Sequence, residues 1–175
     1  YEFAGWSPKT SEVSGDITYT ATFTPVLRSY SVTFGEGVTV LVDGEPIISG
    51  QEIEYGKTLT ISYTESEGYH KTSFKVNGQE QTSPYQHEVT SAVTIEYSEE
   101  INVYTVTLPS VTGYSIESDT TSVNHGSDFK FKVVLSGGYT ESQITVKAND
   151  ETLVLGDDGY YTISNVTQSK TVTIE

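Results

Sequence analysis

The chain has 175 residues, of which 24 are acidic and 9 basic, and its net charge is −15. Such a surface repels phosphate groups, which argues against nucleic acid and anionic membranes as partners. Cys is absent, which excludes disulfides and thiolate metal sites, and no apolar run is long enough to cross a bilayer. Met is also absent, so we expect a processed product or an excised fragment. We also expect a monomer.

The strands expected along the chain follow from alternating apolar and polar residues. The first pair comprises residues 1–8 (YEFAGWSP) and residues 13–23 (VSGDITYTATF). Later stretches alternate in the same way, at residues 30–34, 59–63, 129–133 and 161–163. A period of two places one face of each strand in a core and the other in water.

Turn residues separate these stretches. Asp43-Gly44, Asn77-Gly78 and residues 156–159 (GDDG) are typical of tight turns between antiparallel strands. No window of about a dozen residues carries a helical stripe. The sequence therefore predicts an all-β protein.

Several phrases occur twice in the same order. Residues 30–34 (YSVTF) match 104–108 (YTVTL), residues 55–62 match 125–132, and Gly68-Tyr69 matches Gly138-Tyr139. Residues 74–78 (FKVNG) match 146–150 (VKAND), and residues 93–96 (VTIE) match 172–175 (VTIE). Matches in a fixed order at a spacing of about 70 to 80 residues indicate a tandem repeat.

The repeat predicts the domain boundaries. Residues 29–98 form a first complete repeat and residues 102–175 a second, while residues 1–25 fit only the C-terminal part of a truncated one. We expect each complete repeat to be a small antiparallel, Ig-like β-sandwich. The alternative is a β-grasp unit, which requires a helix. Residues 1–25 are expected to dock on the next repeat or to pair with another copy.

The N-terminal motif resembles a known family. Residues 1–8 and the phrase at residues 15–23 (GDITYTATF) look like the end of a Listeria–Bacteroides repeat of the internalin B type. The two later repeats resemble divergent relatives of it. This resemblance implies a bacterial cell-surface or secreted protein, in which such repeats stand between an adhesive or enzymatic head and an anchor.

Three aromatic residues are candidates for ligand contact. Trp6, the single Trp, can stack on a sugar ring, although packing at the end of its own repeat is the favoured interpretation. Tyr160 and Tyr161 are adjacent, so one faces inward and the other outward, where it can contact a ligand. Tyr69 and Tyr139 recur after Gly and are interpreted as structural.

No pattern predicts a catalytic or metal site. The acidic pair Asp157-Asp158 lacks the further oxygen ligands that calcium needs, and the three His residues are isolated. No nucleophile motif such as Gly-x-Ser-x-Gly occurs. We therefore expect no enzyme activity and no cofactor.

The function predicted from the sequence is a non-enzymatic stalk or spacer that presents a distal functional domain outside the cell. One alternative is an adhesin-type binding module for a glycan or protein of the host or cell surface. Another is an accessory region of an extracellular hydrolase.

Overall fold

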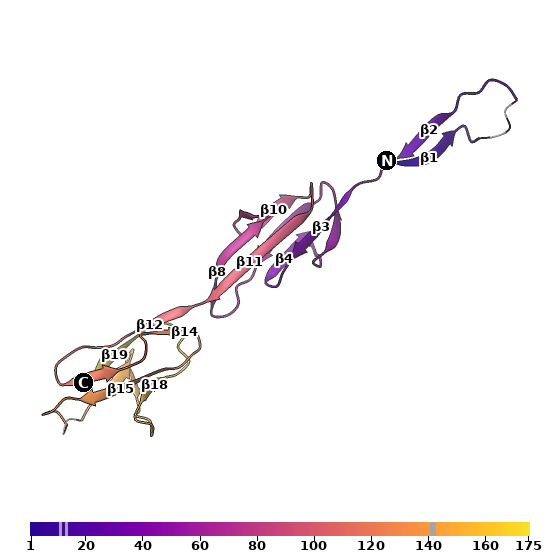
Figure 1. Cartoon of the computed structure of the whole chain (residues 1–175). Coiled ribbons are helices and arrows are strands. Elements are labelled where there is room, and N and C mark those ends of the chain that lie inside the picture. The colour runs from indigo at the N-terminus through magenta and orange to yellow at the C-terminus, as the bar shows by residue number, and fades with distance from the viewer. Residues whose placement is uncertain (11, 13, 141–142) are drawn as a thin grey trace. The chain divides into compact units, whose positions relative to one another are not determined.

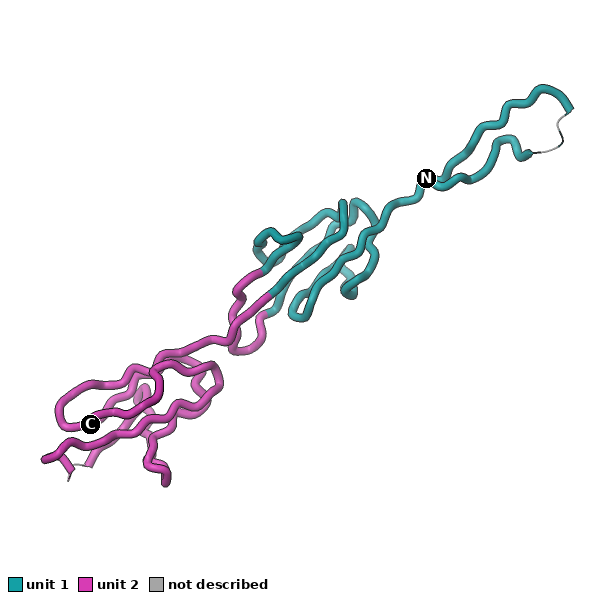
Figure 2. Tube along the Cα trace, in the orientation of Figure 1, with its two compact units in different colours: residues 1–64, 74–97 teal, residues 65–73, 98–175 magenta. Residues whose placement is uncertain are grey.

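The computed structural model describes residues 1–10, 12, 14–140 and 143–175, and all their regular elements are β-strands (Figure 1). The all-β prediction is thus confirmed, and these residues lack the helix of the β-grasp alternative. Val13, predicted as the start of a strand, lies outside the described residues. The chain divides into two compact units (Figure 2). Unit 1 comprises Tyr1–Thr64 and Phe74–Tyr97, and unit 2 comprises Glu65–Ser73 and Ser98–Glu175.

An N-terminal hairpin pairs β1 (Glu2–Ser7) with β2 (Thr20–Thr24) in antiparallel fashion. Trp6 lies opposite Ala21, and Phe3 lies opposite Phe23. The Phe3 ring stands edge-on to Trp6 and to Phe23, with ring centroids 5.6 and 5.9 Å apart. The three rings remain 48 to 57% exposed, so this face of the hairpin is uncovered.

The core of unit 1 lies among the strands of two sheets. Val32, Leu59 and Ile61 are fully buried there, as the alternating pattern predicts, and Phe74 is buried with them. One sheet has the order β10-β7-β4-β5 and the other the order β6-β3-β11-β8-β9. Their bounds are β3 (Ser29–Phe34), β4 (Val38–Val42), β5 (Glu45–Pro46), β6 (Gln51–Glu54), β7 (Thr58–Tyr63), β8 (Tyr69–Val76), β9 (Gln79–Glu80), β10 (Tyr85–Glu88) and β11 (Val93–Ile101).

The core of unit 2 is built in a similar way. Phe129 and Phe131 alternate with outward lysines along one strand and pack with Tyr161, Ile163 and Val172. The sheets have the orders β14-β12-β19-β16-β17 and β13-β15-β18. Their bounds are β12 (Val103–Thr107), β13 (Tyr114–Glu117), β14 (Ser122–Asn124), β15 (Phe129–Leu135), β16 (Val146–Ala148), β17 (Glu151–Leu153), β18 (Tyr161–Ile163) and β19 (Lys170–Ile174).

One strand pair in each core is parallel, and the expectation of purely antiparallel sheets is wrong at this point. β11 lies parallel to β3, with Val93 opposite Val32, and β19 lies parallel to β12, with Thr171 opposite Thr107. In both cases the first long strand of the core neighbours the last. Alternation in a sequence reports which residues face the core, but it does not report the direction of the neighbouring strand.

The same backbone hydrogen bonds occur in both cores. The carbonyls of Val89 and Val166 accept the N–H groups of Gly56 and Gly126, at 2.8 and 2.9 Å. In one core the Thr94 N–H donates to Asn77 Oδ1, and in the other the Thr171 N–H donates to Asn149 Oδ1, both at 2.8 Å.

These bonds correct one predicted match. Because Thr171 takes the place of Thr94, Val172 corresponds to Ile95 and not to Val93. The predicted alignment of residues 93–96 with 172–175 is therefore wrong by two residues. A shift by two keeps every side chain on its face of the strand, and so the alternating pattern could not reveal the error.

Candidate functional site

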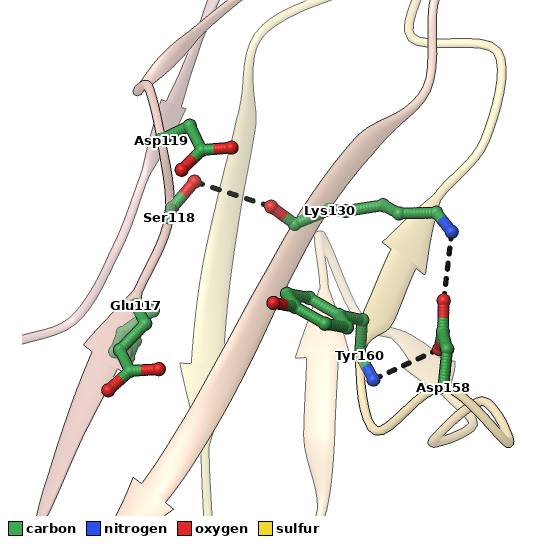
Figure 3. A pocket seen from close by; sticks show the side chains of 7 residues that line it. Glu117, Ser118, Asp119, Lys130, Asp158 and Tyr160 are labelled. Carbon is green, nitrogen blue, oxygen red and sulfur yellow. Dashed lines mark hydrogen bonds and ion pairs between the residues drawn. The ribbon is translucent and has the colours of Figure 1, made fainter.

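A surface depression of about 640 Å³ in unit 2 is the strongest candidate site (Figure 3). It combines an aromatic ring, three carboxyl groups and one ammonium group. Its lining residues are Ile116, Glu117, Ser118, Asp119, Lys130, Asp158 and Tyr160.

Lys130 reaches this depression because of its place in β15. Its neighbours Phe129 and Phe131 are 2% and 0% exposed and point into the core, so Lys130 points outward. Its Nζ lies 3.0 Å from Asp158 Oδ2. Both side chains are about half exposed, so solvent screens this ion pair and it contributes little to stability.

A tight turn places Asp158. The Gly156 N–H donates to the Tyr160 carbonyl at 2.9 Å, and the Tyr160 N–H donates to Asp158 Oδ1 at 3.1 Å. The hydrogen bond from Lys130, followed by that from the Tyr160 backbone, lowers the pKa of the Asp158 carboxyl below its ordinary value. The group therefore stays ionised to lower pH than a free Asp. The turn itself, predicted from residues 156–159, is confirmed.

The adjacent tyrosines face opposite ways. Tyr161 is 7% exposed and stacks on Phe131 in the core, with ring centroids 5.6 Å apart. Tyr160 is 40% exposed and lines the depression. Of the predicted candidates, Tyr160 is thus the one that is accessible in unit 2.

The facing wall follows the end of β13. Ser118 Oγ donates to the carbonyls of Thr120, at 2.8 Å, and Lys130, at 3.3 Å, which ties this segment to β15. Figure 3 shows the Glu117 and Asp119 carboxylates on this wall and the Lys130–Asp158 pair on the other side. Sequence reasoning missed Glu117, Asp119 and Lys130, because the segments that carry them meet only through strand pairing.

The arrangement suits a neutral, hydroxyl-rich ligand. Carboxylates accept hydrogen bonds from hydroxyl groups, and an exposed aromatic ring packs on the apolar side of a sugar. No group of three or more His, Asp or Glu residues positioned to hold a metal ion exists among the residues that the structure describes.

Unit 1 has different residues at the corresponding positions. Tyr85 pairs with Ile61 in β7, as Tyr161 pairs with Phe131 in β15. By this register, Pro84 stands in the place of Tyr160 and Thr60 in the place of Lys130. The ring and the ammonium group of the depression therefore belong to unit 2 alone.

The other sequence candidates lie elsewhere. Trp6 belongs to the hairpin of unit 1 and is 48% exposed. Tyr69 and Tyr139, interpreted as structural, are 39% and 46% exposed and so are not core residues. His125, expected to pack, lies beside Tyr104, with its Nδ1 3.2 Å from the phenol oxygen.

No family model, curated protein or solved structure matches this chain. The resemblance to the internalin B-type repeat accordingly stays a prediction. No helix in the described part of the chain is long and apolar enough to cross a membrane.

Proposed function

We propose that this chain is a non-enzymatic stalk or spacer of a bacterial cell-surface or secreted protein, built from tandem Ig-like β repeats. In this role it presents a distal functional domain and carries tension between that domain and the anchor. The repeats are residues 29–98 and 102–175, preceded by the end of another repeat in residues 1–25.

The observation that carries this proposal is the parallel pairing of the first and last long strands of each core. β3 and β11 run the same way, as do β12 and β19. Because these two strands are parallel neighbours, the start of the first strand and the end of the last strand lie at opposite ends of the sheet. The chain therefore enters each core at one end of the sheet and leaves it at the other. Each core thus adds its own length to a spacer.

The same pairing suits a chain under tension. A force applied at the two ends of such a core acts along the paired strands, so their hydrogen bonds bear the load together and do not open one at a time. The acidic surface supports the extracellular role, because like charges keep neighbouring molecules apart.

Small-angle X-ray scattering of the chain tests the spacer role. A single compact globule of this length has a radius of gyration of about 16 Å, and an unfolded chain one of about 44 Å. We expect a value clearly between these limits that is unchanged between low and high salt. A radius near 16 Å would contradict the proposal, because collapsed repeats cannot hold two other domains apart.

A second candidate function, glycan binding, is favoured by the depression beside Tyr160. A spacer alone does not require its ring and its carboxylates, nor the difference between the two units at the positions of Tyr160 and Lys130. The candidate ligand is a neutral oligosaccharide of a host or bacterial surface.

A glycan array with the intact chain tests this candidate. Binding that is lost in Tyr160→Ala, and retained in Tyr55→Ala, would support it. Tyr55 is the matched control, because it is 51% exposed and does not line the depression. No signal above background, or a signal that both variants retain, would reject the depression as a glycan site.

A further inference from the structure

We propose that the N-terminal hairpin binds the opening segment of another repeat of this type, whose first strand adds to β2 in parallel. The docking surface is the face that carries Phe3, Trp6, Ala21 and Phe23, together with the outer edge of β2. Within the described sheet, β2 pairs with β1 and has no second neighbour. This inference depends on the repeat correspondence and is independent of the mechanical role.

The hairpin corresponds to the neighbouring strands β8 and β11 in one core and β16 and β19 in the other. Residues 20–23 (TATF) of β2 align without gaps with residues 94–97 (TIEY) of β11 and 171–174 (TVTI) of β19. The pairing agrees with this alignment. Trp6 lies opposite Ala21 as Ala148 lies opposite Val172, and both strand pairs are antiparallel.

The corresponding faces differ in burial. In unit 2, Val146, Ala148 and Val172 are each 1% exposed and belong to the core. In the hairpin, Phe3 is 55%, Trp6 48% and Phe23 57% exposed. The apolar residues of the hairpin therefore occupy positions that are buried in unit 2, but no facing sheet covers them among the described residues. A two-stranded hairpin is at best marginally stable in water.

The two cores of this chain show which elements cover the apolar face of a closing strand. In each core the closing strand has the opening strand beside it in parallel, β3 for β11 and β12 for β19. The side chains of the facing sheet, such as Leu59 and Ile61 or Phe129 and Phe131, complete the burial. The hairpin is thus expected to take a segment with an opening strand and the strands that follow it.

The chemistry of the opening strand is also defined. It alternates aromatic and aliphatic residues, as Tyr30, Val32 and Phe34 do in residues 30–34. The two opening strands of this chain are already engaged, because β3 pairs with β6 and β11 and β12 pairs with β14 and β19. A further copy of the repeat must therefore supply the strand.

Trp6 provides a direct reporter, because it is the only Trp in the chain. We would fuse a second copy of residues 28–68 directly before Tyr1, since Tyr1 falls near the place of Tyr69 in the repeat. The fusion raises the effective concentration of the segment at the hairpin. The expected result is a blue shift of the Trp6 emission and a loss of its quenching by acrylamide, both reversed at one cooperative urea transition.

The matched control is the same fusion with Val32→Asp in the added copy alone, which places a charge on the docking face of the opening strand. Its Trp6 should remain as exposed as in the unfused chain. Equal emission in the fusion and the unfused chain, or an equal shift in the fusion and its control, would overturn the proposal.

A second measurement addresses the case in which the fusion fails to fold. A synthetic peptide of residues 28–68 is titrated into the intact chain, and a saturable blue shift of Trp6 supports the proposal. Absence of a shift at a large excess of peptide overturns it. A further result would also overturn the proposal. If Trp6 in the chain alone becomes more protected as the concentration rises, and light scattering shows a dimer, the occupant is a second copy of the chain. None of these readouts tests the scattering prediction for the spacer, so the two proposals fail separately.

Discussion

At the scale of single residues, the turns that close the cores depend on backbone conformations that few side chains adopt. Asn77 has φ of 49° and is followed by Gly78, and Asn149 has φ of 45° and is followed by Asp150 at 68°. Positive φ is tolerated best by Gly, Asn and Asp. The Asn-Gly turn was predicted from its sequence. The hydrogen bond that each Asn Oδ1 accepts from an N–H group of a neighbouring strand was not, because that donor lies far along the chain.

Asn149→Ala is expected to destabilise unit 2 by about 1 to 2 kcal/mol. The change adds strain at positive φ and removes the bond from the Thr171 N–H to Oδ1. Urea unfolding measures the loss. Asn149→Gly separates the causes, because it keeps the backbone conformation and removes only the hydrogen bonds of the side chain, to Thr171 and Ser169. It should therefore cost clearly less. Equal losses of stability in both variants would mean that backbone strain at positive φ contributes nothing to the loss.

Gly68 is held in a space too small for any side chain. Its φ is 78°, its carbonyl accepts the Asn102 N–H at 2.8 Å, and an added Cβ would overlap the His125 ring. All three residues belong to unit 2. The sequence offers Gly138 as its counterpart, with φ of 94°, where an added Cβ meets no described atom within 4 Å.

Gly68→Ala should therefore cost more than Gly138→Ala. Both changes add strain of about 1 kcal/mol at positive φ, but only the first also displaces His125. Urea unfolding of the two variants gives the steric cost as their difference. Adding His125→Ala to each should remove most of that difference. Equal costs for Gly68→Ala and Gly138→Ala would show that the contact with His125 does not constrain the loop.

The carboxyl group of Asp158 offers a test by titration. Lys130→Ala removes the main cause of its lowered pKa and should raise that pKa toward the ordinary value. A lowered pKa stabilises the folded state above the ordinary pKa, and this contribution is lost as the pH falls through the folded-state value. NMR titration follows the carboxyl, with Lys132→Ala, on the same strand, as the control. An unchanged pKa in Lys130→Ala would show that the ion pair is absent in solution.

At the scale of elements, the sequence predicted the strands well and the neighbours of those strands less well. The alternation in residues 59–63 and 129–133 matched buried strands, because burial on one face imposes that pattern. The parallel neighbours β3 and β11 could not be read from it, since pairing between distant segments is decided by the whole core. The depression at Tyr160 was predicted only in part for the same reason.

The strand β15 provides the prediction at this scale. Phe131 is 0% exposed, and Phe131→Ala should destabilise unit 2 by about 3 to 5 kcal/mol through lost burial and the cavity that remains. Amide exchange in β15, β18 and β19 should accelerate strongly, while that of β3 and β7 stays unchanged, since each unit has its own core. Phe74→Ala is the reciprocal variant. Loss of protection in both units from either change would mean that they unfold together.

At the scale of the whole molecule, the account depends on the parallel pairing that closes each core. This pairing places the entry and the exit of each core at opposite ends of a sheet. The spacer role that we propose depends on this feature. Scattering at low and high salt tests the part that the acidic surface plays, and Tyr160→Ala tests the polar depression.

Single-molecule force spectroscopy, with the chain pulled from its two ends, tests this central claim most directly, because forced unfolding reports the barrier of the loaded pairing. A core of roughly 70 residues releases roughly 25 nm of chain at about 3.5 Å per residue. We predict two separate events of this size. Their forces should exceed those needed when handles at Asp43 and Asn77 load unit 1 at one turn of each of its two sheets. Gradual extension at low force, or one event that releases both cores together, would contradict the account.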